Sequence, residues 1–221
     1  MKAFLSIALL LSLCGAGFAQ STEWTSDTYK ESTIRGWTVH YNIALDERST
    51  IFHQTDSVLT YELGKFDNIF PQSALKNLKE VGIWVEYKTR NHVAMQYHVS
   101  GDWLRTHGFN PNKERGIELQ ATDYANTDHD SLPLLWYFAT AYEHRELGFN
   151  NPIVTAAFAH AQHIDAYSSA GSFPFRDPNI YFVAVSTAYF GSYTSEPYNR
   201  KRLKQIDPRG YDMVEKAWQI K

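Results

Sequence analysis

The first half of the chain contains short segments in which apolar and polar residues alternate. Residues 37–43 (WTVHYNI) follow this period-two pattern, which predicts a half-buried strand. Short apolar runs at 82–87, 93–99 and 117–121 predict three more strands. These segments are separated by turn-forming residues, so the first half is expected to form a sheet.

Helical spacing of apolar residues dominates after residue 130. One earlier helix is expected at 51–70, and Pro71 ends it because proline lacks the amide hydrogen. Later helices are expected at 132–147, 152–165 and 180–190, with a last one beginning at Asp207-Pro208. Strands followed by helices indicate an α+β fold, with a small mixed sheet in the N-terminal half and a helical C-terminal half.

The N-terminus has the features of a secretion signal. Residues 1–19 join an early lysine to a short apolar stretch and end in small residues, which predicts cleavage between Ala19 and Gln20 and an extracellular location. A lipoprotein signal at Cys14 is disfavoured, because Leu13 stands where a small residue is needed.

The rest of the chain divides into two parts. Residues 20–35 are polar and rich in serine and threonine, which predicts a flexible arm. Residues 36–221 have the length of a single domain. No later segment stays apolar for the roughly 20 residues that a membrane-spanning helix needs, so no membrane span is expected.

Charge and cysteine content exclude several classes of protein. The formal net charge is −3 and the pI is about 6.3, whereas nucleic-acid-binding domains are usually strongly basic, so no nucleic-acid partner is expected. The single cysteine, Cys14, lies in the signal, which excludes disulfides, thiolate zinc sites and a cysteine nucleophile from the secreted chain.

The segment MQYHVSGDWLRTHGFNP is rich in ligand-binding side chains. Its Tyr97, His98, Trp103 and His107 can line a groove, because loops with aromatic and imidazole groups often form binding walls. For the two histidines we favour a structural interpretation, in which each imidazole bonds to carbonyl groups of the loop.

Two other histidine-containing pairs have the residue types of a metal site. His160 and His163 are three residues apart on an expected helix, but two histidines without a third ligand favour a surface helix. Glu143 and His144 are adjacent, so their side chains are expected to point in different directions.

Six sequence blocks form a distinctive set along the chain. They are GWTVH, VGIWVEY, MQYHVSGDWLRTHGFNP, AYEHRELGFNNP, AYFGSYTSEPYNR and LKQIDPRGYDMVEKAW. Together they resemble secreted zinc metallopeptidases of the His-Glu-x-x-His type, and this resemblance implies a zincin-like domain. In that family two histidines one helical turn apart bind zinc, and the glutamate between them polarises the attacking water.

The resemblance places these three catalytic positions at Trp136, Tyr137 and Thr140. An indole has no lone pair for a metal, and threonine and neutral tyrosine are poor zinc ligands. The bulky pair Trp136 and Tyr137 is expected to pack against Phe182 and Tyr189 and to fill the former site.

The third zinc ligand of the family is acidic and precedes Ala-Tyr-Phe-Gly. The matching positions here are Ile180, Ala184 and Thr187, and none of them is acidic. The sequence therefore predicts no catalytic residue, no cofactor and no metal site.

These replacements predict a secreted, catalytically inactive metallopeptidase-like protein with a binding or structural role. Its partner is expected to be a peptide or an extracellular protein, bound by strand addition beside Tyr97, His98 and Trp103. One alternative is an extracellular matrix component without a ligand groove. Another is a hydrolase with relocated zinc ligands, such as His144 with the pair at 160 and 163.

Overall fold

The computed structural model describes residues 28–89, 93–167, 177–191 and 199–220, which form an α+β structure. Within these ranges a five-stranded sheet contains β1 (Tyr29–Ile34), β2 (Trp37–Asn42), β3 (Ile83–Glu86), β4 (Met95–Tyr97) and β5 (Ile117–Gln120). The strand order is β1-β2-β3-β5-β4, with the inner strands parallel and both edge strands antiparallel to their neighbours. The predicted mixed sheet and its four predicted strands are confirmed.

Helices lie between the strands and after the last of them in the chain. They are α1 (Ser49–Ile69), α2 (Gln72–Leu78), α3 (Gly101–Thr106), α4 (Ala121–Tyr124), α5 (Leu134–Tyr142), α6 (Pro152–His163), α7 (Pro178–Phe190), α8 (Arg200–Ile206) and α9 (Pro208–Ala217), with short 3₁₀ turns η2 (Ile43–Leu45), η3 (Pro111–Lys113) and η4 (His129–Ser131) and a π-turn η5 (Glu143–Leu147). None of the described helices combines the length and apolar character needed to cross a membrane.

The flexible arm expected at 20–35 is wrong for its last part, because residues 29–34 form β1. This strand pairs with β2 from Tyr29 opposite Asn42 to Ile34 opposite Trp37. The two strands are joined by Arg35 and Gly36, whose φ angles of 51° and 88° suit a two-residue hairpin turn. Polar β1 residues hide the strand signal, since β1 is an exposed edge. The signal segment and residues 20–27 lie outside the described residues.

The segment after β4 also differs from the expectation. Gly101 and Asp102 begin the short helix α3, in a segment expected to be a loop. Ser100 caps this helix by accepting a hydrogen bond from the amide of Trp103 at 3.2 Å. Trp103, expected on a loop, therefore lies on a helix that begins shortly after β4.

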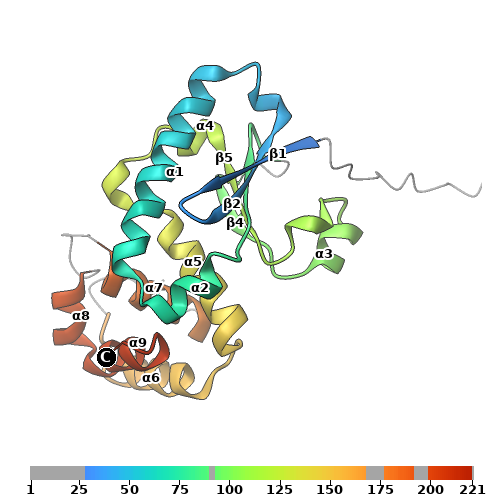
Figure 1. Cartoon of the computed structure of the whole chain (residues 1–221). Coiled ribbons are helices and arrows are strands. Elements are labelled where there is room, and N and C mark those ends of the chain that lie inside the picture. Colours follow the sequence, from blue (N-terminus) through green and yellow to red (C-terminus); the bar gives the residue numbers. More distant parts are fainter. Residues whose placement is uncertain (1–27, 90–92, 168–176, 192–198, 221) are drawn as a thin grey trace, which may run out of the picture.

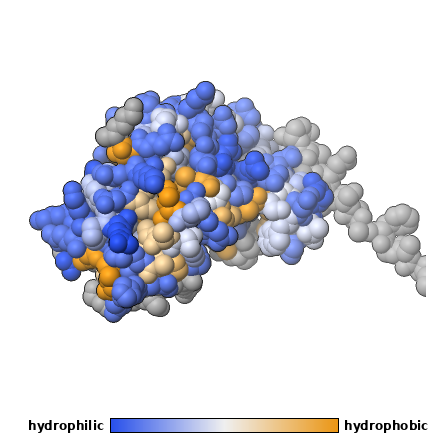
Figure 2. All heavy atoms as spheres, turned by 90° about the horizontal axis from the view of Figure 1, so that it is seen from below, coloured by the Kyte–Doolittle hydropathy of each residue, from blue (hydrophilic) through white to orange (hydrophobic). Residues whose placement is uncertain are grey.

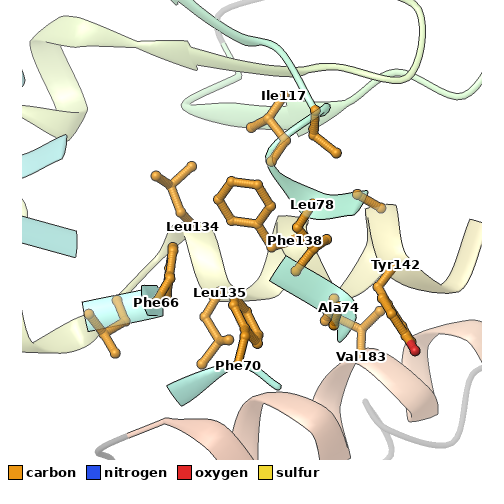
Figure 3. Packing of buried hydrophobic residues seen from close by; sticks show 14 of the residues in the cluster. Phe66, Phe70, Ala74, Leu78, Ile117, Leu134, Leu135, Phe138, Tyr142 and Val183 are labelled. Carbon is orange, nitrogen blue, oxygen red and sulfur yellow. The ribbon is translucent and has the colours of Figure 1, made fainter. Parts of the chain in front are cut away.

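The two faces of the sheet have opposite character. Apolar residues line one face and are buried: Val39, Tyr41, Ile83, Val85, Ile117 and Leu119. Figure 1 shows α1 on one side of the sheet and α3 on the other. In the core, Phe66 of α1 meets Phe138 of α5 edge-to-face, with ring centroids 5.3 Å apart, next to Leu134 (Figure 3). This packing places α5 beneath the apolar face.

A second aromatic cluster joins the C-terminus to this core. Trp218 is fully buried and stacks on Tyr142 at 3.9 Å and on Phe70 at 5.3 Å between ring centroids. Its indole donates a hydrogen bond to Ser186 of α7 at 3.1 Å. The residue after α9 thus ties α5 and α7 together.

Candidate binding site at the β4 edge

Trp136, Tyr137 and Thr140 lie on α5, where the resemblance places the zinc-binding motif. The Thr140 hydroxyl donates a hydrogen bond to the backbone carbonyl of Trp136 at 3.0 Å. Burial raises the pKa of the Tyr137 phenol, which keeps it protonated. An indole, a neutral phenol and a hydroxyl bonded to its own helix do not fit a zinc ion, which takes imidazole, thiolate or carboxylate ligands.

The matching positions of the third ligand lie along α7. Thr187 donates its hydroxyl hydrogen to the carbonyl of Val183 at 2.8 Å, and Ala184 is buried. Ile180 lies in the first turn of the helix. Its amide donates a hydrogen bond to the side chain of Asp177, the N-cap residue. The side chains at these positions supply no ligand that zinc prefers.

Phe182 and Tyr189 take part in a different cluster from the one expected. The ring of Phe182 is stacked with Trp218, and the ring of Tyr189 contacts Tyr211. Both therefore serve the interface between α7 and the C-terminal segment. Their expected packing against the aromatic pair of α5 stays a prediction.

The histidines considered as relocated zinc ligands have different surroundings. His144 Nδ1 lies 3.0 Å from the hydroxyl of Tyr97, whereas His160 and His163 lie at the end of α6. Among the residues that the structure describes, no three His, Cys, Asp or Glu side chains are arranged to hold a metal ion.

A buried charged network covers the polar face of the sheet. Lys113 of η3 bonds to Glu118 of β5 at 2.8 Å and also to Glu86 of β3. The other oxygen of Glu118 lies 2.6 Å from Nε2 of His98, and Tyr29 donates its hydroxyl hydrogen to Glu86. The network fastens η3, and with it α3, to the sheet.

The charges of this network stabilise one another. Burial alone raises the pKa of Glu118, but the hydrogen bond from His98 and the charge of Lys113 outweigh it and lower this pKa to about 2. Burial also disfavours the ammonium of Lys113, yet Glu86 and Glu118 together raise its pKa. The carboxylate of Glu118 and the ammonium of Lys113 therefore stay charged near neutral pH.

The structural interpretation of the two loop histidines is half correct. His107 Nδ1 lies 2.8 Å from the carbonyl oxygen of Trp103, so its bonding to the local backbone is confirmed. His98 instead meets the carboxylate of Glu118, so the expected bond to a loop carbonyl is wrong for this ring. The acidic residue that pairs with His98 lies twenty positions away, on a different strand.

The backbone of β4 leaves hydrogen-bonding groups along its outer edge. The carbonyl of Ala94 accepts a hydrogen bond from Gln120, and His98 donates to Gly116. Inward and outward bonding alternates along an antiparallel strand, so the backbone groups of residues 95 and 97 point away from β5. Because β4 is the last strand in the sheet order, these groups form an edge that another strand can pair with.

Aromatic side chains lie on the elements that contact or follow β4. Tyr97 reaches His144 on the π-turn, and the His144 ring stacks on Phe149 with centroids 4.9 Å apart. On α3, Trp103 is 50% exposed and stacks on His107 with centroids 4.1 Å apart. The exposed ring of Trp103 therefore lies on the helix that comes after β4 in the chain.

The four predicted groove residues do not converge on one point. Successive side chains of a strand point to opposite faces, so Tyr97 faces α5 and His98 faces the buried network. Trp103 on α3 stacks on His107, the C-cap residue of that helix. Tyr97 is thus the predicted groove residue that lies on β4 itself, and His98, one residue beyond the strand, bonds within the network.

Glu143 is a functional candidate that the pattern of residues does not reveal. It begins the π-turn, is fully buried, and neither carboxylate oxygen has a hydrogen-bond partner among the described residues. Burial and the nearby charge of Asp177 raise its pKa to about 8. Its charged neighbour is Asp177, whereas the adjacent His144 bonds to Tyr97. The signal available in the sequence is its position about one helical turn beyond Thr140.

Two surface hollows lie at the helical end of the molecule, away from β4. The larger, of about 780 Å³, lies between the end of α1 and the end of α7 and includes Phe70, Phe190 and Arg200 in its lining. A shallower groove of about 290 Å³ runs between α6 and α9. Figure 2, which views this end, shows apolar side chains gathered across the middle of the face. None of the predicted groove residues lines either hollow.

Comparison of the chain with protein-family models, with curated proteins and with solved structures finds no match. The likeness to zinc metallopeptidases therefore rests on the six sequence blocks.

Proposed function

We propose that this chain is a secreted, catalytically inactive metallopeptidase-like protein that binds an extended peptide along the outer edge of β4. The observation that carries the proposal is the set of outward backbone groups at Met95 and Tyr97, deduced from the inward bonds of Ala94 and His98. An added strand would pair with these groups, as in other cases of β-strand addition.

The proposed lack of catalytic activity is supported by the chemistry of the side chains at the zinc-binding positions. The positions that would bind zinc hold an indole, a protonated phenol and a hydroxyl that bonds to its own helix, at Trp136, Tyr137 and Thr140. Without these ligands no bound water would be activated, and with tyrosine in place of glutamate no carboxylate base would accept its proton.

The peptide-binding part is supported by the rigidity and the flanks of the edge. The buried bond between His98 and Glu118 holds β4 against β5, so the edge is ordered before a ligand arrives. The flanks proposed to contact the peptide are the exposed ring of Trp103 on α3 and the side chain of Tyr97, whose hydroxyl bonds to His144. Since β4 has only three residues, we expect weak binding with broad sequence tolerance.

The experiment uses the chain beginning at Gln20, labelled with ¹⁵N, and pools of synthetic heptapeptides. We expect peptide addition to shift the amide signals of Met95 and Tyr97, and we expect Trp103→Ala to weaken binding about tenfold, a loss of ~1.4 kcal/mol. The matched control is Ile164→Ala, because Ile164 is 43% exposed but lies after α6. Binding by Trp103→Ala equal to wild type, or shifts confined to other elements, would count against the proposal.

A further inference from the structure

The turn that follows α5 has an unusual hydrogen-bond register. The amide of Gly148 donates to the carbonyl of Glu143 at 2.8 Å, a bond that spans five residues where an α-helix spans four. A π-turn therefore holds one residue more than the α-helical turn it replaces, and such turns often occur at functional sites. A change to the α register would rotate the side chains of the turn by about 100° per residue.

The carboxyl group of Glu143 lies inside the protein, and the described residues provide it with no hydrogen-bond donor. The residue is fully buried and both oxygens are unpartnered. The charged group that faces it from α7 is Asp177, which is acidic and itself accepts the amide of Ile180. A buried carboxylate beside another acid is unfavourable, so the present geometry suits the protonated form.

The same turn contacts the β4 edge through its second residue. His144 bonds to the hydroxyl of Tyr97, and the charged groups around its ring are Arg115, Arg145 and Glu114. Burial and the two arginines lower the pKa of His144, so its own titration falls at acidic pH. The turn thus joins a buried acid on one side to the proposed peptide edge on the other.

The third residue of the turn is fixed elsewhere. Arg145 donates a hydrogen bond to Glu80 at 2.8 Å, in the segment that follows α2. A rearrangement of the turn would therefore have to break both this ion pair and the bond between His144 and Tyr97.

We propose that ionisation of Glu143 rearranges the π-turn and releases Tyr97, so that peptide affinity at the β4 edge falls as Glu143 loses its proton. A charged carboxylate cannot remain unpaired beside Asp177, and a register change of the turn is the shortest route by which it can leave the interior. The regulatory part rests on the proposed function, whereas the coupling between Glu143 and Tyr97 stands independently of it.

The test follows the ¹³Cζ signal of Tyr97 by NMR from about pH 6 to about pH 9.5, without any peptide. We expect an inflection near pH 8 in the wild type and none in Glu143→Gln, which keeps the shape but does not titrate. The Tyr97 phenol, with a pKa raised by burial to about 12, does not itself titrate in this range. Glu62→Gln is the matched control, because burial raises the pKa of Glu62 to about 8 as well but Glu62 lies on α1. That variant should retain the inflection.

A second measurement follows heptapeptide binding. If the released form does not bind, the apparent Kd of the wild type should rise roughly tenfold between about pH 7 and about pH 9, and that of Glu143→Gln should stay constant. A Tyr97 signal that is flat across the range in the wild type overturns the inference, even if Glu143→Gln fails to fold. An inflection without any peptide binding supports the coupling and overturns only the proposed function.

Discussion

The imidazole of His98, the residue after β4, and the carboxylate of Glu118 on β5 lie 2.6 Å apart in the interior. Lys113 completes the arrangement by bonding to the second oxygen of Glu118. A histidine expected to fix a loop therefore fixes the edge strand of the sheet. The end of β4 and the segment that carries Trp103 are held by the same buried charges.

Removing the charge of Glu118 should destabilise the protein strongly. In Glu118→Gln the ammonium of Lys113 and the ring of His98 would lose their anionic partner inside the protein, which costs about 3 kcal/mol or more. Urea unfolding measures this change. Glu114→Gln, a substitution at an exposed neighbouring position, should change the free energy of unfolding by less than about 0.5 kcal/mol. Equal stability of Glu118→Gln and wild type would show that the network contributes nothing.

The same carboxylate predicts a loss of stability in acid. The pKa of Glu118 is about 2 in the folded protein, against an ordinary value of 4.5, so its stabilisation is present above the ordinary value and is lost as the pH falls toward 2. Unfolding followed between about pH 5 and about pH 2 should show a slope of up to ~1.4 kcal/mol per pH unit from this group. Glu118→Gln should lack that component, and an unchanged slope would contradict the assignment.

Raising the pH from about 4.5 to about 8 should destabilise the protein through the two buried acids with raised pKa values. Glu62 and Glu143 both have a pKa of about 8 in the folded protein, against an ordinary value of 4.5. Their contribution is therefore fully present below the ordinary value, declines as the pH rises to about 8 and changes no further above it. Each should add a slope of about −1.4 kcal/mol per pH unit, so Glu143→Gln should remove about half of the decline. If the free energy of unfolding declines equally with pH in the wild type and in Glu143→Gln, the carboxylate of Glu143 is ionised and in contact with water, contrary to this account.

Two tryptophans should respond very differently to truncation. Trp218→Ala removes a fully buried ring stacked on Tyr142 and Phe70, and it should lower the free energy of unfolding by about 3–5 kcal/mol. Trp103→Ala removes a half-exposed ring and should change stability by about 0.5 kcal/mol or less while weakening peptide binding. Chemical denaturation of both variants provides the comparison. A large loss of stability in Trp103→Ala would mean that Trp103 is part of the core.

Much of the fold is predictable because periodicity reflects which face is buried. The alternation at residues 37–43 and the helical spacing at 51–70 give β2 and α1 nearly to their ends. β1 is not predictable in this way, since most of its side chains are exposed and Ile34 alone among them is buried. The sequence signal that indicates β1 is the turn between β1 and β2, where a glycine follows an arginine.

The site is less predictable, because partners distant in sequence decide it. Nothing near His98 in the sequence indicates that Glu118 lies against its ring, and the π register of residues 143–147 has no periodic signature. The roles of Trp136 and Thr140 are easier to predict, since indole and hydroxyl groups are poor zinc ligands wherever the helix lies.

The most direct test of the account asks whether the protein retains metal-dependent hydrolysis. The chain from Gln20 onward is loaded with zinc, dialysed and incubated with a mixed peptide library, with and without a chelator, and cleavage is followed by mass spectrometry. The account predicts no stoichiometric zinc and no cleavage above the blank in either sample. Peptide cleavage that the chelator abolishes would contradict it.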